Sequence, residues 1–146
     1  MAKTLEAPLY MRAKEVDTAV RALFSKNGYI MLSEVRNGTG FERAPRTADM
    51  IAASTWPSRG LFIEGIEIKV TRSDLRRELQ TPEKADAIAK YCRHWWVAGP
   101  KGLFAEDMHL PEKWGFIEVD EKGKAKVAIK AAELEPVQMD ALLVCS

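Results

Sequence analysis

A turn flanked by two β-rich runs constrains the fold of this chain more than any other feature of its sequence. The runs are TADMIAAST at 47–55 and LFIEGIEIKV at 61–70, and WPSRG separates them. Pro57 and Gly60 favour a turn in that segment. Two strand-like runs joined by a short turn are typical of a β-hairpin. The sequence therefore predicts that these runs are neighbouring antiparallel strands.

The predicted hairpin brings two acidic residues together. Asp49 lies nine positions before the centre of the turn, and Glu67 lies nine positions after it. Residues equidistant from the centre of a hairpin face each other, with opposed side chains about 4.5–5.5 Å apart. Two carboxylates so close repel, and a cation between them relieves that repulsion. Carboxylate oxygens are ligands that Mg²⁺ prefers, with water and a substrate phosphate completing its octahedron, so we expect a magnesium site here.

A lysine accompanies the two acids. Successive strand side chains point to opposite faces, so Lys69 shares a face with Glu67 while Ile66 and Ile68 share the other. An ammonium in this position can orient the attacking water or stabilise negative charge that develops on a phosphate. The alternative interpretation is that Glu67 and Lys69 are solvated side chains on an exposed strand.

The remaining sequence alternates helical and strand patterns. Apolar residues recur at helical spacing between Val16 and Phe24, and Asn27-Gly28 favours a helix end there. Helices are predicted at 15–28, 71–79, 82–92 and 136–144, and further strands at 29–35, 94–100, 114–120 and 126–131. Ser73 is the expected N-cap of the second helix. This order predicts an α/β (α+β) fold, in which helices flank a central mixed β-sheet.

The length and composition favour a small soluble protein. A chain of 146 residues has the size of one domain, and no Gly/Pro-rich linker divides it, so we expect a single domain over 1–146. No apolar run reaches the roughly 18 residues that span a bilayer, and no signal peptide is evident. Cys92 and Cys145 have neither metal-ligand spacing nor a disulfide framework. We therefore expect a cytoplasmic protein with no membrane partner.

Basic residues are concentrated in the middle of the chain. Residues 69–101 contain eight Lys and Arg against four Asp and Glu. Such an excess is typical of a surface that contacts a phosphate backbone, although two amphipathic helices with solvated faces would give the same count. The candidate DNA-binding residues follow the second hairpin strand, and they are Arg72, Arg76, Arg77 and Lys84.

The order of these motifs resembles the PD-(D/E)XK nuclease superfamily, especially its small stand-alone members from bacterial DNA repair and phages. ADM on one strand, EIK on the next and a basic helix carry the resemblance, which covers 29–98. It implies a restriction-endonuclease-like core, α-β-β-β-α-β, here followed by a C-terminal hairpin. By the same resemblance, Asp49 and Glu67 match the metal-binding acids and Lys69 the catalytic lysine, while the backbone carbonyl of Ile68 is an additional metal ligand.

The resemblance implies a DNA endonuclease that hydrolyses phosphodiester bonds in DNA repair, recombination or phage DNA processing. Its cofactor would be Mg²⁺, with Mn²⁺ as a substitute. The chain departs from the family pattern at Ala48, where the superfamily has proline. Many members also use a glutamate of the first helix, for which Glu15 and Glu34 are both candidates.

Two other functions remain open on the sequence. The chain could be a nucleic-acid-binding module that keeps a nuclease fold without turnover, or a protein interaction domain in which EIK is only surface. Trp95 and Trp96 are interpreted as packing residues, with base stacking as the alternative. A homodimer is a further expectation, because cutting two strands usually requires two sites and symmetric pairing is common.

Overall fold

The computed structural model describes residues 8–36, 47–60 and 62–137. The helices and strands are α1 (Ala13–Ser25), β1 (Tyr29–Arg36), β2 (Thr47–Ser54), η1 (Pro57–Arg59), β3 (Ile63–Ile68), α2 (Arg72–Gln80), η2 (Pro82–Lys84), α3 (Asp86–Ala89), β4 (His94–Pro100), β5 (Gly115–Val119) and β6 (Ala125–Ile129). Among the helices described, none is long and apolar enough to cross a membrane. The helix predicted at 136–144 lies almost wholly outside the described residues.

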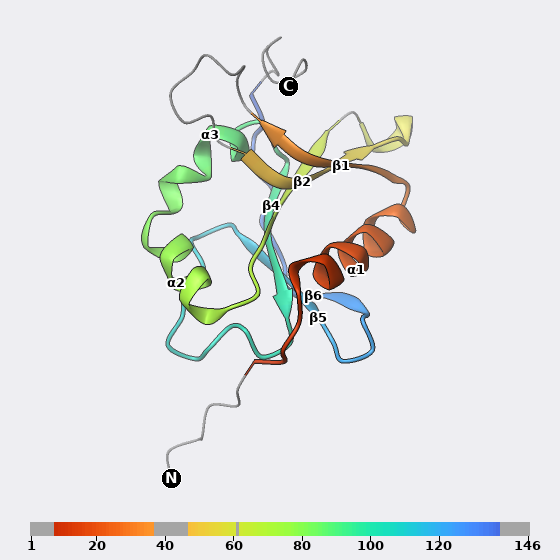
Figure 1. The fold of residues 1–146 in the computed structure, drawn as a ribbon. Helices are drawn as coiled ribbons and strands as arrows, with labels where there is room; N and C mark the ends of the chain where they lie inside the picture. Colours follow the sequence, from red (N-terminus) through yellow and green to blue (C-terminus); the bar gives the residue numbers. More distant parts are fainter. Residues whose placement is uncertain (1–7, 37–46, 61, 138–146) are drawn as a thin grey trace.

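The strands of the described part form one six-stranded sheet in the order β1-β2-β3-β4-β5-β6. The pairs β1–β2, β2–β3 and β5–β6 are antiparallel, whereas β3–β4 and β4–β5 are parallel. Helix α1 lies on one face of the sheet, and α2 and α3 lie on the other (Figure 1). The predicted α+β fold with a mixed sheet between helices is confirmed, and so are both predicted hairpins, β2–β3 and β5–β6.

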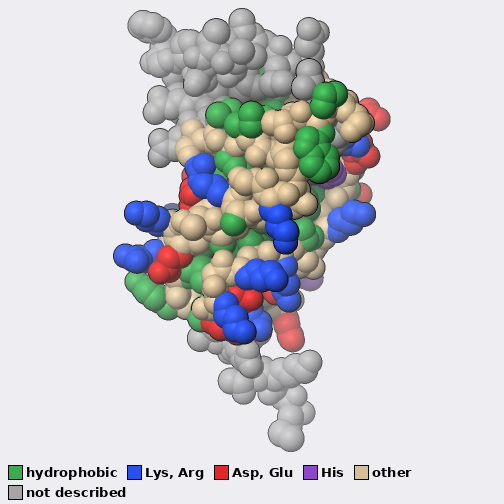
Figure 2. Space-filling model, turned by 90° about the vertical axis from the view of Figure 1, so that its right-hand side faces the viewer, with side chains coloured by type: hydrophobic (Ala, Val, Ile, Leu, Met, Phe, Trp, Pro, Cys, Tyr) green, Lys and Arg blue, Asp and Glu red, His purple; other side chains and the backbone are tan. Residues whose placement is uncertain are grey.

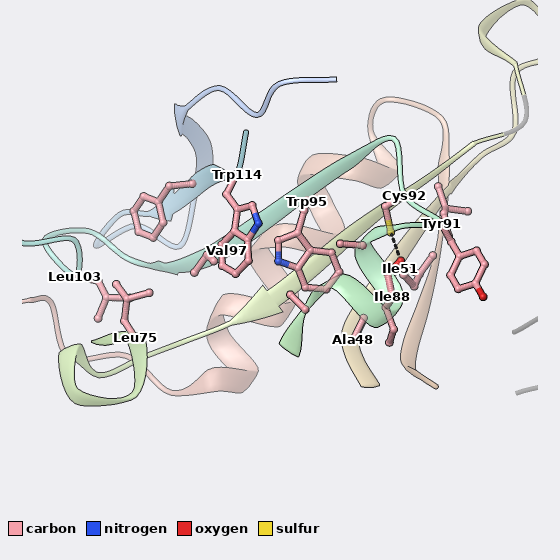
Figure 3. Close-up of a cluster of buried hydrophobic side chains, with 14 of the residues drawn as sticks. Ala48, Ile51, Leu75, Ile88, Tyr91, Cys92, Trp95, Val97, Leu103 and Trp114 are labelled. Atoms are coloured by element: carbon pink, nitrogen blue, oxygen red, sulfur yellow. Dashed lines mark hydrogen bonds between the residues drawn. The ribbon is translucent and has the colours of Figure 1, made fainter. Parts of the chain in front are cut away.

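Two adjacent tryptophans of β4 anchor the two faces of this sheet. Trp95 belongs to the core beneath α2 and α3, which Figure 3 shows in close-up, and Trp96 belongs to the core beneath α1. Each pairs with a glycine on a neighbouring strand, Trp95 with Gly65 and Trp96 with Gly115. A Cβ at either glycine would lie 2.4 or 2.5 Å from the indole ring. Both tryptophans are buried, so packing explains them and base stacking does not.

Helix α2 follows β3 after a short link, and a threonine fixes its start. The Thr71 side chain accepts the backbone N–H of Asp74 at 3.2 Å. Thr71 is therefore the N-cap, and the prediction of Ser73 is wrong by two residues: Ser73 already lies inside the helix. The helix packs through Leu75, which is fully buried, against the core formed with α3 and β4.

A buried carboxylate lies in the sheet on the same face as α1. Glu64 on β3 is 4% exposed. Its Oε2 accepts the Trp96 indole N–H at 2.8 Å, and its Oε1 is hydrogen-bonded to His94 Nδ1 at 2.8 Å. Both carboxylate oxygens are thus satisfied by side chains of β4, and the bonds join β3 to β4 beyond the backbone ladder. Sequence reasoning did not single out Glu64.

We predict that Glu64→Ala lowers the free energy of unfolding by about 2–4 kcal/mol, because it leaves the Trp96 N–H buried without an acceptor and removes a paired buried group. Glu64→Gln keeps a side-chain oxygen and should cost less. Urea unfolding measures both, with Glu121→Ala at an exposed turn as the control. Equal effects of Glu64→Ala and Glu121→Ala would contradict a structural role for this carboxylate.

Candidate active site

The strands β2 and β3 stop pairing at the predicted acidic residues. Their register pairs Met50 with Ile66 as the last step toward the end of β3, and continuing it one residue places Asp49 opposite Glu67. At that point the Asp49 Oδ2 atom accepts the backbone N–H of Ile68 at 2.8 Å. A side-chain carboxylate therefore takes the position that a backbone carbonyl would have in a continued ladder.

The place where β2 and β3 separate, at Asp49 and Ile68, is called the fork below. Beside it, Glu67, Lys69 and Glu78 form a cluster. The Lys69 Nζ atom is 3.5 Å from Glu67 Oε1 and 3.5 Å from Glu78 Oε2. The three side chains are only 17–19% exposed. Lys69 follows directly after β3 and Glu78 comes from α2, so the cluster joins a strand end to a helix on the same face of the sheet.

Burial and neighbouring charge raise the pKa of Glu67 from 4.5 to about 7. Burial is the largest cause, and the Asp49 and Glu78 carboxylates add to it, while Lys69 opposes it. Burial lowers the pKa of Lys69, but the carboxylates of Glu67, Glu78 and Asp49 together raise it above its ordinary value. Lys69 is therefore an ammonium near neutral pH, suited to holding negative charge and not to accepting a proton.

On the α1 side, Asp49 and Ile68 line an open hollow of about 520 Å³. The other lining residues come from α1 and β1, and they are Ala13, Lys14, Asp17, Arg21 and Ser33. Arg21 Nε donates to Asp17 Oδ1 at 2.6 Å, and the Arg21 guanidinium also bonds the Ser33 hydroxyl. The acid that α1 brings to this hollow is thus Asp17.

The two glutamates proposed from the sequence have different places. Glu15 caps its own helix: Oε2 accepts the Arg12 N–H at 2.9 Å, and the side chain is half exposed. Glu34 lies on β1, and its side chain is outside the described residues. Whether either completes a metal site stays a prediction. The signal for Asp17 was its spacing, because positions 13, 17 and 21 fall on one side of a helix.

The arginines of α2 have partners of their own. Arg72 donates to the Gly102 carbonyl at 2.9 Å and thereby ties α2 to the segment after β4. Arg76 lies 3.2 Å from Asp107 Oδ2, and Arg77 lies 3.7 Å from Asp74. Lys84 is exposed at the end of η2. Of the four predicted DNA-binding residues, Arg72 is partly buried, and the exposed ones are Arg76, Arg77 and Lys84.

Opposite charges also mix elsewhere on the surface. On the face drawn in Figure 2, which looks onto the side where α1 lies in Figure 1, Lys and Arg are interspersed with Asp and Glu. The net charge of the whole chain is +1. A net charge this small gives the chain as a whole little long-range attraction for nucleic acid, so contacts at individual side chains would matter more.

The donor set at the fork suits a hard cation. After burial, the Asp49 carboxylate is the next largest cause that raises the pKa of Glu67, so a cation here would relieve an unfavourable interaction. Carboxylate and carbonyl oxygens are ligands of Mg²⁺ and Mn²⁺. The described residues contain no group of three or more His, Cys, Asp and Glu placed to hold an ion, so water or substrate would have to supply the remaining ligands.

We predict that the Glu67 carboxylate destabilises the fold at alkaline pH. Its folded-state pKa is raised, so between pH 4.5 and about 7 the folded state binds more protons than the unfolded state. The free energy of unfolding therefore falls as pH rises through that window. Without divalent ions, Glu67→Gln should be more stable than the parent at pH 8 by on the order of 1–3 kcal/mol.

Urea unfolding at pH 4.5, 6 and 8 measures this effect, with Glu121→Gln at the exposed turn as the control. The two proteins should differ least at the lowest pH, where the carboxyl is protonated in the folded parent and half protonated in the unfolded parent. Parallel stability profiles for the parent and Glu67→Gln would refute the raised pKa.

No protein-family model and no curated protein matches the sequence. Among solved structures, the chain is similar to the SPO1766 protein of unknown function from Silicibacter pomeroyi. The match has a TM-score of 0.67 and 17% sequence identity, and it covers 94% of this chain and 87% of that one. This likeness extends over nearly the whole of both chains and concerns the fold alone.

Proposed function

We propose that this chain is a metal-dependent DNA endonuclease that hydrolyses phosphodiester bonds. The observation that carries the proposal is the end of the β2–β3 ladder, where Asp49 accepts the Ile68 N–H and the adjacent Glu67 pairs with Lys69. Burial, and next the Asp49 carboxylate, raise the pKa of Glu67 there, which supports a site that a cation would stabilise. The roles proposed for these residues are those that the resemblance to PD-(D/E)XK nucleases implies.

The residues divide the work of hydrolysis as follows. Asp49 and Glu67, with the Ile68 carbonyl, would hold Mg²⁺, which supplies an activated water and withdraws charge from the phosphoryl oxygens. The Lys69 ammonium would offset the charge that grows on the phosphate and orient the water. Lys14, on the rim of the hollow, would contact a neighbouring phosphate of the strand. DNA is the proposed partner because a positioned ammonium and carboxylates suit phosphodiesters.

We predict that Lys69→Ala lowers the cleavage rate by about 10²–10³ while the fold is retained, because one preorganised charge is removed from the reacting phosphate. Asp49→Asn should cost at least as much. Asparagine keeps an oxygen for the Ile68 N–H, so this variant removes charge and spares the fork. Linear, branched and single-stranded DNA with Mg²⁺ or Mn²⁺ form the assay, and Lys122→Ala at an exposed turn is the control.

The same assay identifies the further acid. Asp17→Asn, Glu15→Gln and Glu34→Gln each remove one charge without changing side-chain length, and the largest loss of rate marks the residue that acts at the site. If the parent protein cuts no DNA of the panel and binds no divalent ion, the nuclease proposal fails. Binding of DNA without cleavage would then favour a nucleic-acid-binding module.

We predict a second, electrostatic effect at α2. Replacing Arg76 and Arg77 with alanine should flatten the dependence of DNA affinity on salt by roughly one unit of slope per lost phosphate contact. The double replacement of Lys122 and Lys124, which removes the same charge from the β5–β6 turn, is the control. Fluorescence anisotropy between low and physiological salt measures the slope. Equal slopes for all three proteins would mean that the α2 arginines serve only their ion pairs.

A further inference from the structure

We propose that Glu78 is a positioning residue that fixes the Lys69 ammonium at the active site. This inference rests on the proposed function, because a fixed ammonium matters only if Lys69 acts on a bound phosphate. It concerns a residue that neither the sequence motifs nor the resemblance singled out.

The contact geometry places the ammonium between two carboxylates of different origin. Lys69 Nζ is 3.5 Å from an oxygen of Glu67 on the strand and 3.5 Å from an oxygen of Glu78 on the helix. Lysine has a flexible four-carbon side chain, so a single contact restrains it poorly. A second contact, from a different element, restrains the position of Nζ further.

The two contacts are not equivalent when the site is loaded. Glu67 is a proposed metal ligand, and oxygens that bind an ion are less available to Lys69. Glu78 lies on a separate element, so its contact with Lys69 persists when Glu67 turns to the metal. Glu78 is thus the partner that would hold the ammonium at the moment when it is needed.

Helix α2 is itself held firmly enough to serve this purpose. Thr71 caps its first turn, Leu75 is fully buried in the core, and Arg72 is bonded to the Gly102 carbonyl. Glu78 is three residues after Leu75 and therefore lies near the face of the helix that packs on the protein. This location explains why its side chain is only 18% exposed, unlike the neighbouring Arg77, whose side chain is 76% exposed.

An ordinary ion pair that only stabilises the fold is the competing interpretation. Such a pair would change stability when broken and would leave the turnover of the folded enzyme unaltered. A positioning role changes kcat with little effect on KM, and it acts through Lys69 alone. Loss of Glu78 should then cost little once Lys69 has been removed.

The test compares Glu78→Ala, Glu78→Gln and Glu78→Asp with the parent, with Glu83→Ala on the exposed part of η2 as the matched control. On the DNA that the parent cuts best, we expect Glu78→Ala to lower kcat about 10–100-fold, the usual cost of losing a residue that orients a catalytic group. KM and the melting temperature should change little. Glu78→Asp should recover part of the activity, and Lys69→Ala combined with Glu78→Ala should match Lys69→Ala alone.

A second measurement needs no activity. Limited acetylation followed by mass spectrometry reports how accessible the Lys69 amine is, with Lys122 and Lys124 as internal references. Glu78→Ala should raise the relative rate at Lys69, and Glu83→Ala should not. Unchanged acetylation, an unchanged kcat, or additive losses in the double variant would each overturn the proposal. A parent protein that neither cuts DNA nor binds a divalent ion would refute the proposed function, while acetylation would still decide whether Glu78 holds Lys69.

Discussion

The hydrogen bond from the Ile68 N–H to the Asp49 carboxylate is the contact on which the rest of the site depends. The backbone ladder between β2 and β3 runs as far as Met50 and Ile66. One step further, the carboxylate satisfies the Ile68 donor, so the strands can separate without leaving that N–H unpaired. The same bond anchors Asp49 to the strand that carries Glu67 and Lys69. The same hydrogen bond therefore lets β2 and β3 separate and keeps Asp49 next to the strand end that carries Glu67 and Lys69.

Because the fork lies at the end of two central strands, elements on both faces of the sheet reach it. Helix α1 brings Asp17 to the hollow on one side, and α2 brings Glu78 to Lys69 on the other. A tryptophan packs over a glycine of the neighbouring strand on each face of the sheet, Trp95 over Gly65 and Trp96 over Gly115. A site that draws on opposite layers requires a rigid sheet between them, and this sheet has large buried side chains on both faces.

The sequence predicted the elements that depend on local pattern. It did not predict contacts between residues that are distant in the chain. The β2–β3 hairpin followed from the turn, and its register, continued by one residue, places Asp49 opposite Glu67. The contact between Glu78 and Lys69 could not be predicted from local pattern, because it depends on how α2 packs after β3. The cap prediction was wrong because Thr71 and Ser73 carry similar hydroxyls, and only the backbone geometry shows which one accepts an N–H.

Counting charges was a weaker guide still. Residues 69–101 do contain more Lys and Arg than Asp and Glu. However, Arg72 donates a hydrogen bond to the Gly102 carbonyl, and Arg76 forms an ion pair with Asp107. Asp107 lies outside the counted segment, so no window over the sequence could have revealed that pairing. Exposure and partners, and not composition, decide which basic side chains are free to meet a phosphate.

The electrostatics of the fork are difficult to explain by stability alone. Burial and the carboxylates of Asp49 and Glu78 raise the pKa of Glu67 there, and Lys69 is the ammonium that opposes this effect. Burial makes each unbalanced charge more costly than it would be at the surface. Departures of this kind from good packing tend to occur at functional sites, where the surrounding fold maintains them. A bound cation at Asp49 and Glu67 would remove the imbalance and leave Glu78 to balance Lys69.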